Sequence, residues 1–182
     1  MRRTSIAALS CIFLASCGGG AVVGGVGGEY VSPFYSPSLV SYVAQDGRFP
    51  MVLRGNPFAG VPQAQLEQTL HREIPTPGWA PRAQFVRNDN AEAGRGLRLV
   101  MLLNPVQNVD FRAICGDLQG IGFAGPNNQI TLRVAFCDNA QTMTDVTLRT
   151  APSPDPTSPA FTGALSTMTS IALPFVDRAR ER

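Results

Sequence analysis

The sequence predicts an α+β domain, a two-layer sandwich in which a mainly antiparallel sheet of about five strands carries two helices on one face. Three observations lead to this fold class. Short apolar or alternating runs are typical of strands, two stretches repeat apolar residues at helical spacing, and turn-forming residues separate these segments. The expected order is strand, helix, strand, strand, disulfide-pinned loop, strand, strand, helix.

The first strand and the first helix are expected between residues 49 and 74. Residues 49–54 form a short run in which Pro50, lacking a backbone N–H, restricts the strand to a sheet edge or to a strand start. Pro62 is well placed to begin a helix over residues 63–74. The apolar residues of this helix recur four apart and form one stripe: Leu66, Leu70 and Ile74.

Two strands are expected on either side of a polar turn. Residues 82–87 read as the second strand, and residues 88–96 have the composition of a hairpin loop. Residues 97–103, LRLVMLL, are apolar almost throughout, so we expect the central strand here, covered on both faces or nearly so. Trp79 lies in the preceding PGWAP loop, either as a plug over the core edge or as an exposed contact residue.

Residues 104–128 are rich in glycine, proline and asparagine and read as a loop. Residues 120–125 match G-x-G-x-x-G literally. A dinucleotide site needs a helix directly after this motif, and here Pro126 and two asparagines lead into a strand instead. The glycines therefore predict a compact loop, and no cofactor is expected.

Cys115 and Cys137 are expected to form one disulfide, because such a pair in an oxidising compartment is typical of a disulfide. Closing this loop of about 22 residues stabilises the fold by roughly 3 kcal/mol in the chain-entropy model. A metal site would need further ligands. His71 is the single histidine and neighbours the stripe of the first helix, so no metal is expected.

The last two strands are expected as a hairpin over residues 129–136 and 143–149. Alternation turns the apolar residues to one side and places Arg133 and Arg149 together on the other. That second face is either solvated or a weak anion-contact face. Ser158 and Pro159 then cap and open a final helix. Its apolar residues recur at helical spacing: Phe161, Leu165, Met168 and Ala172.

The N-terminus has the order of a secretory signal peptide: Arg2 and Arg3, a short apolar run over residues 6–15, then small residues. The apolar run is too short to span a bilayer, which takes roughly 20 residues. The sequence Leu-Ala-Ser-Cys, ending at Cys17, resembles the lipobox of bacterial lipoproteins. The alternative is an ordinary signal peptide that contains a cysteine.

The resemblance implies cleavage before Cys17 and acylation of that cysteine, which would anchor the protein in a membrane. Gly18 after the cysteine favours the periplasmic face of the outer membrane, with the inner membrane or surface exposure as alternatives. The expected organisation is a signal peptide (1–16), a glycine-rich tether and aromatic arm (17–47), one periplasmic domain (48–176) and a charged tail (177–182).

The arm at residues 29–47 follows a glycine-rich stretch, residues 18–28, that is expected to be a flexible tether. Disordered segments are poor in aromatic residues, so this arm is expected to dock. Pro33 and Pro37 would break any regular helix within the arm. The arm docks either on its own domain or on a partner. Its candidate contact residues are Tyr30, Phe34, Tyr35 and Tyr42.

Composition excludes some function classes. Without Arg2 and Arg3 the basic residues equal the 13 acidic ones in number, so no basic stripe for nucleic acid remains. No serine-elbow motif surrounds a nucleophile, and no catalytic residue is predicted.

The leading interpretation is therefore a non-enzymatic lipoprotein that scaffolds or assists an envelope protein partner. The expected element order resembles, in architecture alone, small lipoproteins of outer-membrane assembly. The alternatives are a small-ligand or lipid-binding lipoprotein, with an apolar cavity of at least ~300 Å³, and a hydrolase of envelope polymer.

Overall fold

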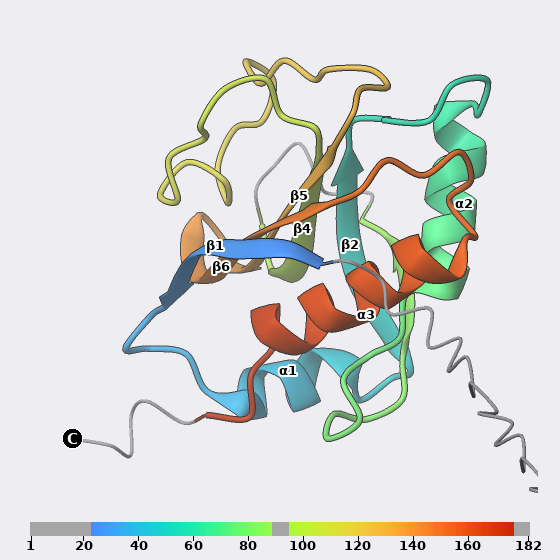
Figure 1. Cartoon of the computed structure of the whole chain (residues 1–182). Coiled ribbons are helices and arrows are strands. Elements are labelled where there is room, and N and C mark those ends of the chain that lie inside the picture. The colour runs from blue at the N-terminus through green and yellow to red at the C-terminus, as the bar shows by residue number, and fades with distance from the viewer. Residues whose placement is uncertain (1–22, 89–94, 177–182) are drawn as a thin grey trace, which may run out of the picture.

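A computed structural model describes residues 23–88 and 95–176 of the chain (Figure 1). The expected turn at residues 88–96 lies mostly outside these ranges, as does the charged tail. Within them the chain forms six strands and three helices. In chain order these are β1 (Val23–Val31), α1 (Pro37–Ala44), β2 (Arg48–Arg54), α2 (Gln63–Glu73), β3 (Gln84–Arg87), β4 (Leu97–Leu103), β5 (Ile130–Asp138), β6 (Gln141–Thr150) and α3 (Pro159–Ala172).

The described strands form one mixed sheet in the order β1-β6-β5-β4-β2-β3. The pairs β1/β6, β6/β5 and β5/β4 are antiparallel, whereas β2 runs parallel to both β4 and β3. The predicted α+β fold with a mainly antiparallel sheet is confirmed. From β2 onward the elements follow the expected order, with the disulfide-pinned loop between β4 and β5.

β1 is a strand that the sequence did not predict. The expectation of a flexible tether is wrong from Val23 onward, because this segment pairs antiparallel with β6. Glycine is depleted in strands, so the local pattern gives no strand signal. The free edge of β6 supplies the hydrogen bonds instead, and residues from Val23 onward belong to the folded domain, which was expected only from residue 48.

α1 contradicts the expectation that proline breaks any helix in the arm. Pro37 occupies the first turn, where the missing N–H has no intrahelical partner to lose. Ser36 caps the helix, its Oγ accepting a hydrogen bond from the Ser38 backbone N–H at 3.4 Å. Val40 and Ala44 are buried in the core, so the helix is held by packing.

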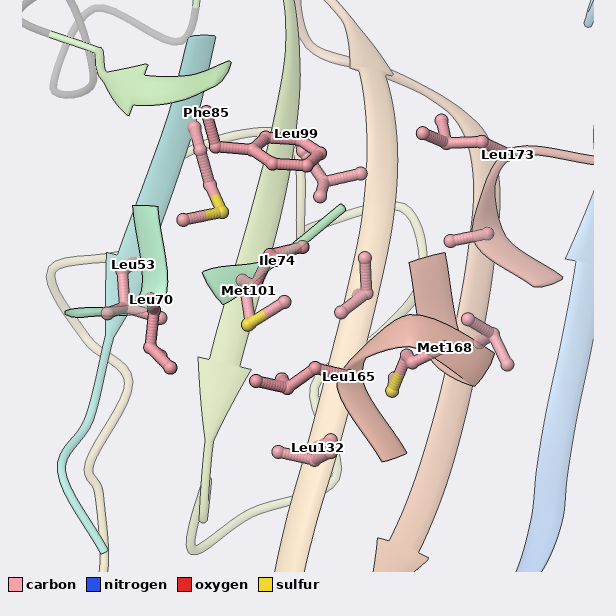
Figure 2. Close-up of a cluster of buried hydrophobic side chains, with 14 of the residues drawn as sticks. Leu53, Leu70, Ile74, Phe85, Leu99, Met101, Leu132, Leu165, Met168 and Leu173 are labelled. Atoms are coloured by element: carbon pink, nitrogen blue, oxygen red, sulfur yellow. The ribbon is translucent and has the colours of Figure 1, made fainter. Parts of the chain in front are cut away.

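The main core lies between the sheet and the three helices. Figure 2 shows Leu99 and Met101 of β4 facing Leu165 and Met168 of α3, with Leu70 of α2 at the side. All four predicted apolar residues of the last helix are buried, and Ser158 accepts the predicted capping bond from the Phe161 N–H. The central position of β4, between β2 and β5, is also confirmed.

The opposite face of the sheet is covered too, by the loop over residues 104–128. A second apolar cluster forms there, with Val52, Val100 and Ala135 beneath Ile114 and Cys115. The expectation that β5 is half-buried is therefore wrong, because strand alternation does not report what a distant loop covers. Arg133 does share this face with Arg149, since their cross-strand partners are Thr147 and Thr131, but Arg133 is buried.

Arg133 is buried together with an acid. Its Nε and Nη2 donate to the two carboxylate oxygens of Asp145 at 3.0 and 2.6 Å, and Nη1 donates to the Val109 carbonyl. A buried charge needs this kind of full pairing, because desolvation otherwise disfavours it strongly. The pair ties β5 and β6 to the covering loop.

Two positions of β2 and the turn after it, Pro50 and Gly55, have special backbone requirements. Pro50 is the third residue of β2, an inner strand that already pairs with β3 at this point, so the expectation of a sheet edge or a strand start is wrong. The strand tolerates the missing N–H because pairing with β4 begins only at Met51. Gly55 has a φ of 85°, and a Cβ there would lie 2.1 Å from the Leu103 carbonyl oxygen. Only glycine fits this turn.

Candidate functional site

The structure separates the candidate contact residues into buried and exposed ones. Tyr35 is fully buried, and its hydroxyl donates to the Pro174 carbonyl at 2.6 Å. Tyr30 packs against Phe111 of the covering loop, with ring centroids 4.7 Å apart. Phe34 and Tyr42, by contrast, are 71% and 65% exposed. The arm thus docks on its own domain but leaves two aromatic rings in solvent.

Phe175, 73% exposed, is a further aromatic residue that sequence reasoning missed. It follows Pro174, directly after the end of α3, and its ring lies 5.4 Å from that of Trp79. Trp79 is half-buried, and its Nε1 donates to the Leu173 carbonyl at 3.1 Å. An apolar residue placed after a helix-ending proline was the available signal.

The segments that carry these aromatic residues lie at one end of the molecule. Tyr35 and Pro174 are hydrogen-bonded, so the chain next to Phe34 and the chain next to Phe175 are in contact. Figure 1 shows α1, the segment after α3 and the loop after α2 at the same end. We call this set, made of Phe34, Tyr42, Trp79 and Phe175, the aromatic end.

α1 turns Tyr42 outward because its inner face is occupied. Val40 and Ala44, two residues before and after Tyr42, are buried in the core. At about 100° per residue, both lie on the side of the helix opposite to Tyr42. The exposure of this ring therefore follows from the way the helix packs, and the ring adds nothing to the core.

The predicted disulfide between Cys115 and Cys137 is confirmed, with the two Cα atoms 5.5 Å apart. Arg98 of β4 lies beside the disulfide. It is a charged residue in an otherwise apolar strand, and it is only 1% exposed. Its guanidinium donates to the carbonyls of Cys115, Gly96 and Asn139 at 2.6, 3.0 and 2.8 Å. Burial lowers the pKa of Arg98, and the charge of Asp138 opposes this shift. These bonds fix the loop on the β5–β6 turn.

His71 lies in a groove of about 360 Å³ between α2 and β3. Burial lowers the pKa of His71, while Glu67 raises it and Arg87 lowers it further. Its Nε2 is buried and has no hydrogen-bond partner among the described residues. No serine, threonine or cysteine lines this groove in the described part of the chain, so His71 has no nucleophile beside it.

No group of three histidine, cysteine, aspartate or glutamate side chains that would hold a metal ion occurs among residues 23–88 and 95–176. None of the helices described is both long and apolar enough to cross a bilayer. Cys17, the predicted lipidation site, lies outside the described residues.

Comparisons of the chain with protein-family models, with curated proteins and with solved structures found no match.

Proposed function

We propose that this protein is a lipid-anchored envelope protein that scaffolds or assists another envelope protein without catalysing a reaction. The observation that carries the proposal is the aromatic end, with three aromatic side chains more than half exposed. Aromatic residues are enriched at protein interfaces, where a few of them supply most of the binding energy. An exposed group of them is costly unless a partner covers it.

The place of the anchor favours a protein rather than the bilayer as the partner of this surface. The proposed lipid on Cys17 is six residues from Val23, a span of at most ~22 Å. β1 then runs about 26 Å, at ~3.3 Å per residue, before the chain turns into α1. The aromatic end lies beyond the end of β1 opposite to Val23, the residue nearest the proposed anchor, and this favours a periplasmic partner over the bilayer.

Position-specific photocrosslinking in the native cells tests this proposal. A photoreactive phenylalanine analogue replaces Phe34, Tyr42 or Phe175 in the full chain. The matched control places it at Ala151, which is exposed and lies at the opposite end of the sheet, next to Thr150. We expect the same envelope protein to crosslink from the aromatic end and not from Ala151.

Alanine variants separate contact from stability. Tyr42→Ala combined with Phe175→Ala should abolish co-purification of that protein, while stability changes by under about 0.5 kcal/mol per exposed side chain. Equal crosslinking from Ala151, or unchanged co-purification with the double variant, would refute the proposal.

A further inference from the structure

A second surface feature is independent of the aromatic end. It is a hollow of about 550 Å³ on the loop-covered face of the sheet, which we call the β1–loop hollow. Two strands, β5 and β6, line it together with the start of the covering loop and two glycines of β1, and we call the glycine side its rim. The lining residues that matter below are Gly27, Gly28, Thr131, Arg133, Thr147 and Arg149.

The charge of this hollow is positive. Its lining includes two arginines and no acidic residue. Arg133 is neutralised by its bidentate pair with Asp145, which lies outside the lining. Arg149 is exposed, and its side chain makes no hydrogen bond or ion pair with any described residue. One guanidinium is therefore left with its donors free beside the hollow.

The neighbours of Arg149 are hydroxyl groups. Thr131 is its direct cross-strand partner, and Thr147 precedes it by two residues on the same face of β6. Both threonines are half-buried, and neither hydroxyl is hydrogen-bonded within the described part of the chain. A guanidinium fork beside two hydroxyl donors is a set that suits the oxygens of a phosphate or carboxylate group.

The glycines of β1 keep the rim open. A Cβ built on Gly27 or on Gly28 meets no atom within 4 Å, so side chains there would project into free space. The volume lies in the range of ordinary ligand sites, roughly 300–1,000 Å³, and exceeds what a bare oxyanion fills. Polar and charged side chains line the hollow beside the apolar Pro105 and Val106, whereas a lipid-binding protein was expected to have a wholly apolar cavity.

We infer that the β1–loop hollow binds the phosphate group of an organic ligand. The Arg149 guanidinium pairs with the phosphate oxygens, and the hydroxyls of Thr131 and Thr147 donate to them. The organic part of the ligand occupies the remaining volume, along the rim of Gly27 and Gly28. The phosphate belongs either to a soluble metabolite or to a phospholipid headgroup, since both present the same chemistry.

Calorimetric titration of the full chain, with Cys17→Ser to prevent acylation, tests the inference. The soluble probe is glycerol 3-phosphate, and the membrane probe is phosphatidylglycerol vesicles, with phosphatidylcholine vesicles for comparison. We expect Arg149→Gln to weaken binding at least about tenfold, the loss that follows from removing one charge-assisted pair. Arg82→Gln, at an exposed arginine outside the hollow, is the matched control and should leave binding unchanged.

Gly27→Val provides a second test, because Gly27 lines the hollow and a Cβ at this position meets no atom within 4 Å. It should weaken binding while the free energy of unfolding stays close to that of the parent protein. Binding of glycerol 3-phosphate with no gain from vesicles assigns a soluble ligand. Tighter binding to phosphatidylglycerol vesicles, lost in Arg149→Gln, assigns a headgroup. Absence of binding to both probes, or equal losses in Arg149→Gln and Arg82→Gln, overturns the inference, and neither result affects the crosslinking test.

Discussion

Replacing Asp145 with alanine is expected to destabilise the fold strongly, because it leaves the Arg133 guanidinium buried without its counter-charge. The two side chains are 9% and 6% exposed, and the carboxylate accepts two of the guanidinium's hydrogen bonds. After the substitution, the Val109 carbonyl is the remaining hydrogen-bond partner of Arg133 within the described chain. Both side chains are less than a tenth exposed, and Arg133 meets solvent where it lines the β1–loop hollow.

The magnitude follows from the burial. Removing one partner of a buried ion pair typically costs about 3–5 kcal/mol. A domain of this size is stable by only about 5–15 kcal/mol, so the loss takes a large share. With a urea dependence of about 2 kcal/mol per molar, the unfolding midpoint should fall by roughly 2 M.

Urea unfolding followed by circular dichroism measures this loss, with Asp46→Ala as a control at an exposed acid. The double variant Arg133→Met, Asp145→Leu removes both charges and should recover most of the stability. About 1 kcal/mol remains lost, because the Val109 carbonyl no longer has its donor. A loss below about 1 kcal/mol in Asp145→Ala, or a double variant as unstable as the single one, would show that the pair is not desolvated as described.

Three further substitutions test particular contacts. Gly55→Ala should lower the free energy of unfolding by about 3 kcal/mol, because it adds left-handed backbone strain and a steric clash. Gly60→Ala, with φ 73° but open space around it, should lower it by only about 1 kcal/mol. Equal losses of the two variants in thermal unfolding would contradict this. Burial raises the pKa of Tyr35 above its ordinary value of 10.0, so an unfolded chain loses this proton first and stability should fall as pH rises above 10. Tyr35→Phe should remove that dependence, and at neutral pH it should lose about 1 kcal/mol with the bond to Pro174. Burial lowers the pKa of His71, so stability should fall as pH drops below 6.5, where the unfolded histidine binds a proton first; an unchanged pH slope in His71→Gln would contradict this.

Local sequence patterns predicted the elements from β2 to α3 because, in each of them, the spacing of apolar residues shows which side of the element is buried. The stripe of α2, the alternation of β6 and the cap at Ser158 are all properties of a few neighbouring residues. The disulfide was predictable because the assignment of Cys11 to the signal peptide and of Cys17 to the lipid leaves Cys115 and Cys137 as one pair. In these segments local preference and the fold agree.

The candidate sites were predicted less completely, because exposure depends on what packs from elsewhere. The four aromatic residues of the arm look alike in sequence, yet Tyr35 is buried beneath the segment after α3 while Tyr42 faces solvent. Arg133 and Arg149 likewise occupy equivalent places in an alternating pattern. The register of β5 against β6 brings Asp145 next to Arg133, whereas Arg149 lies on the same strand as Asp145, four residues along it.

By itself, the sequence determined the fold class, the order of elements from β2 onward, the disulfide and the polar character of the hairpin's second face. The tertiary structure alone decided that the glycine-rich segment from Val23 is a strand, that a loop buries the second face of the sheet, and which aromatic rings stay in solvent. The physical reason is the range of the interactions. Periodicity and capping act within one turn or one strand, whereas edge pairing, loop coverage and charge pairing are made by residues far apart in the chain.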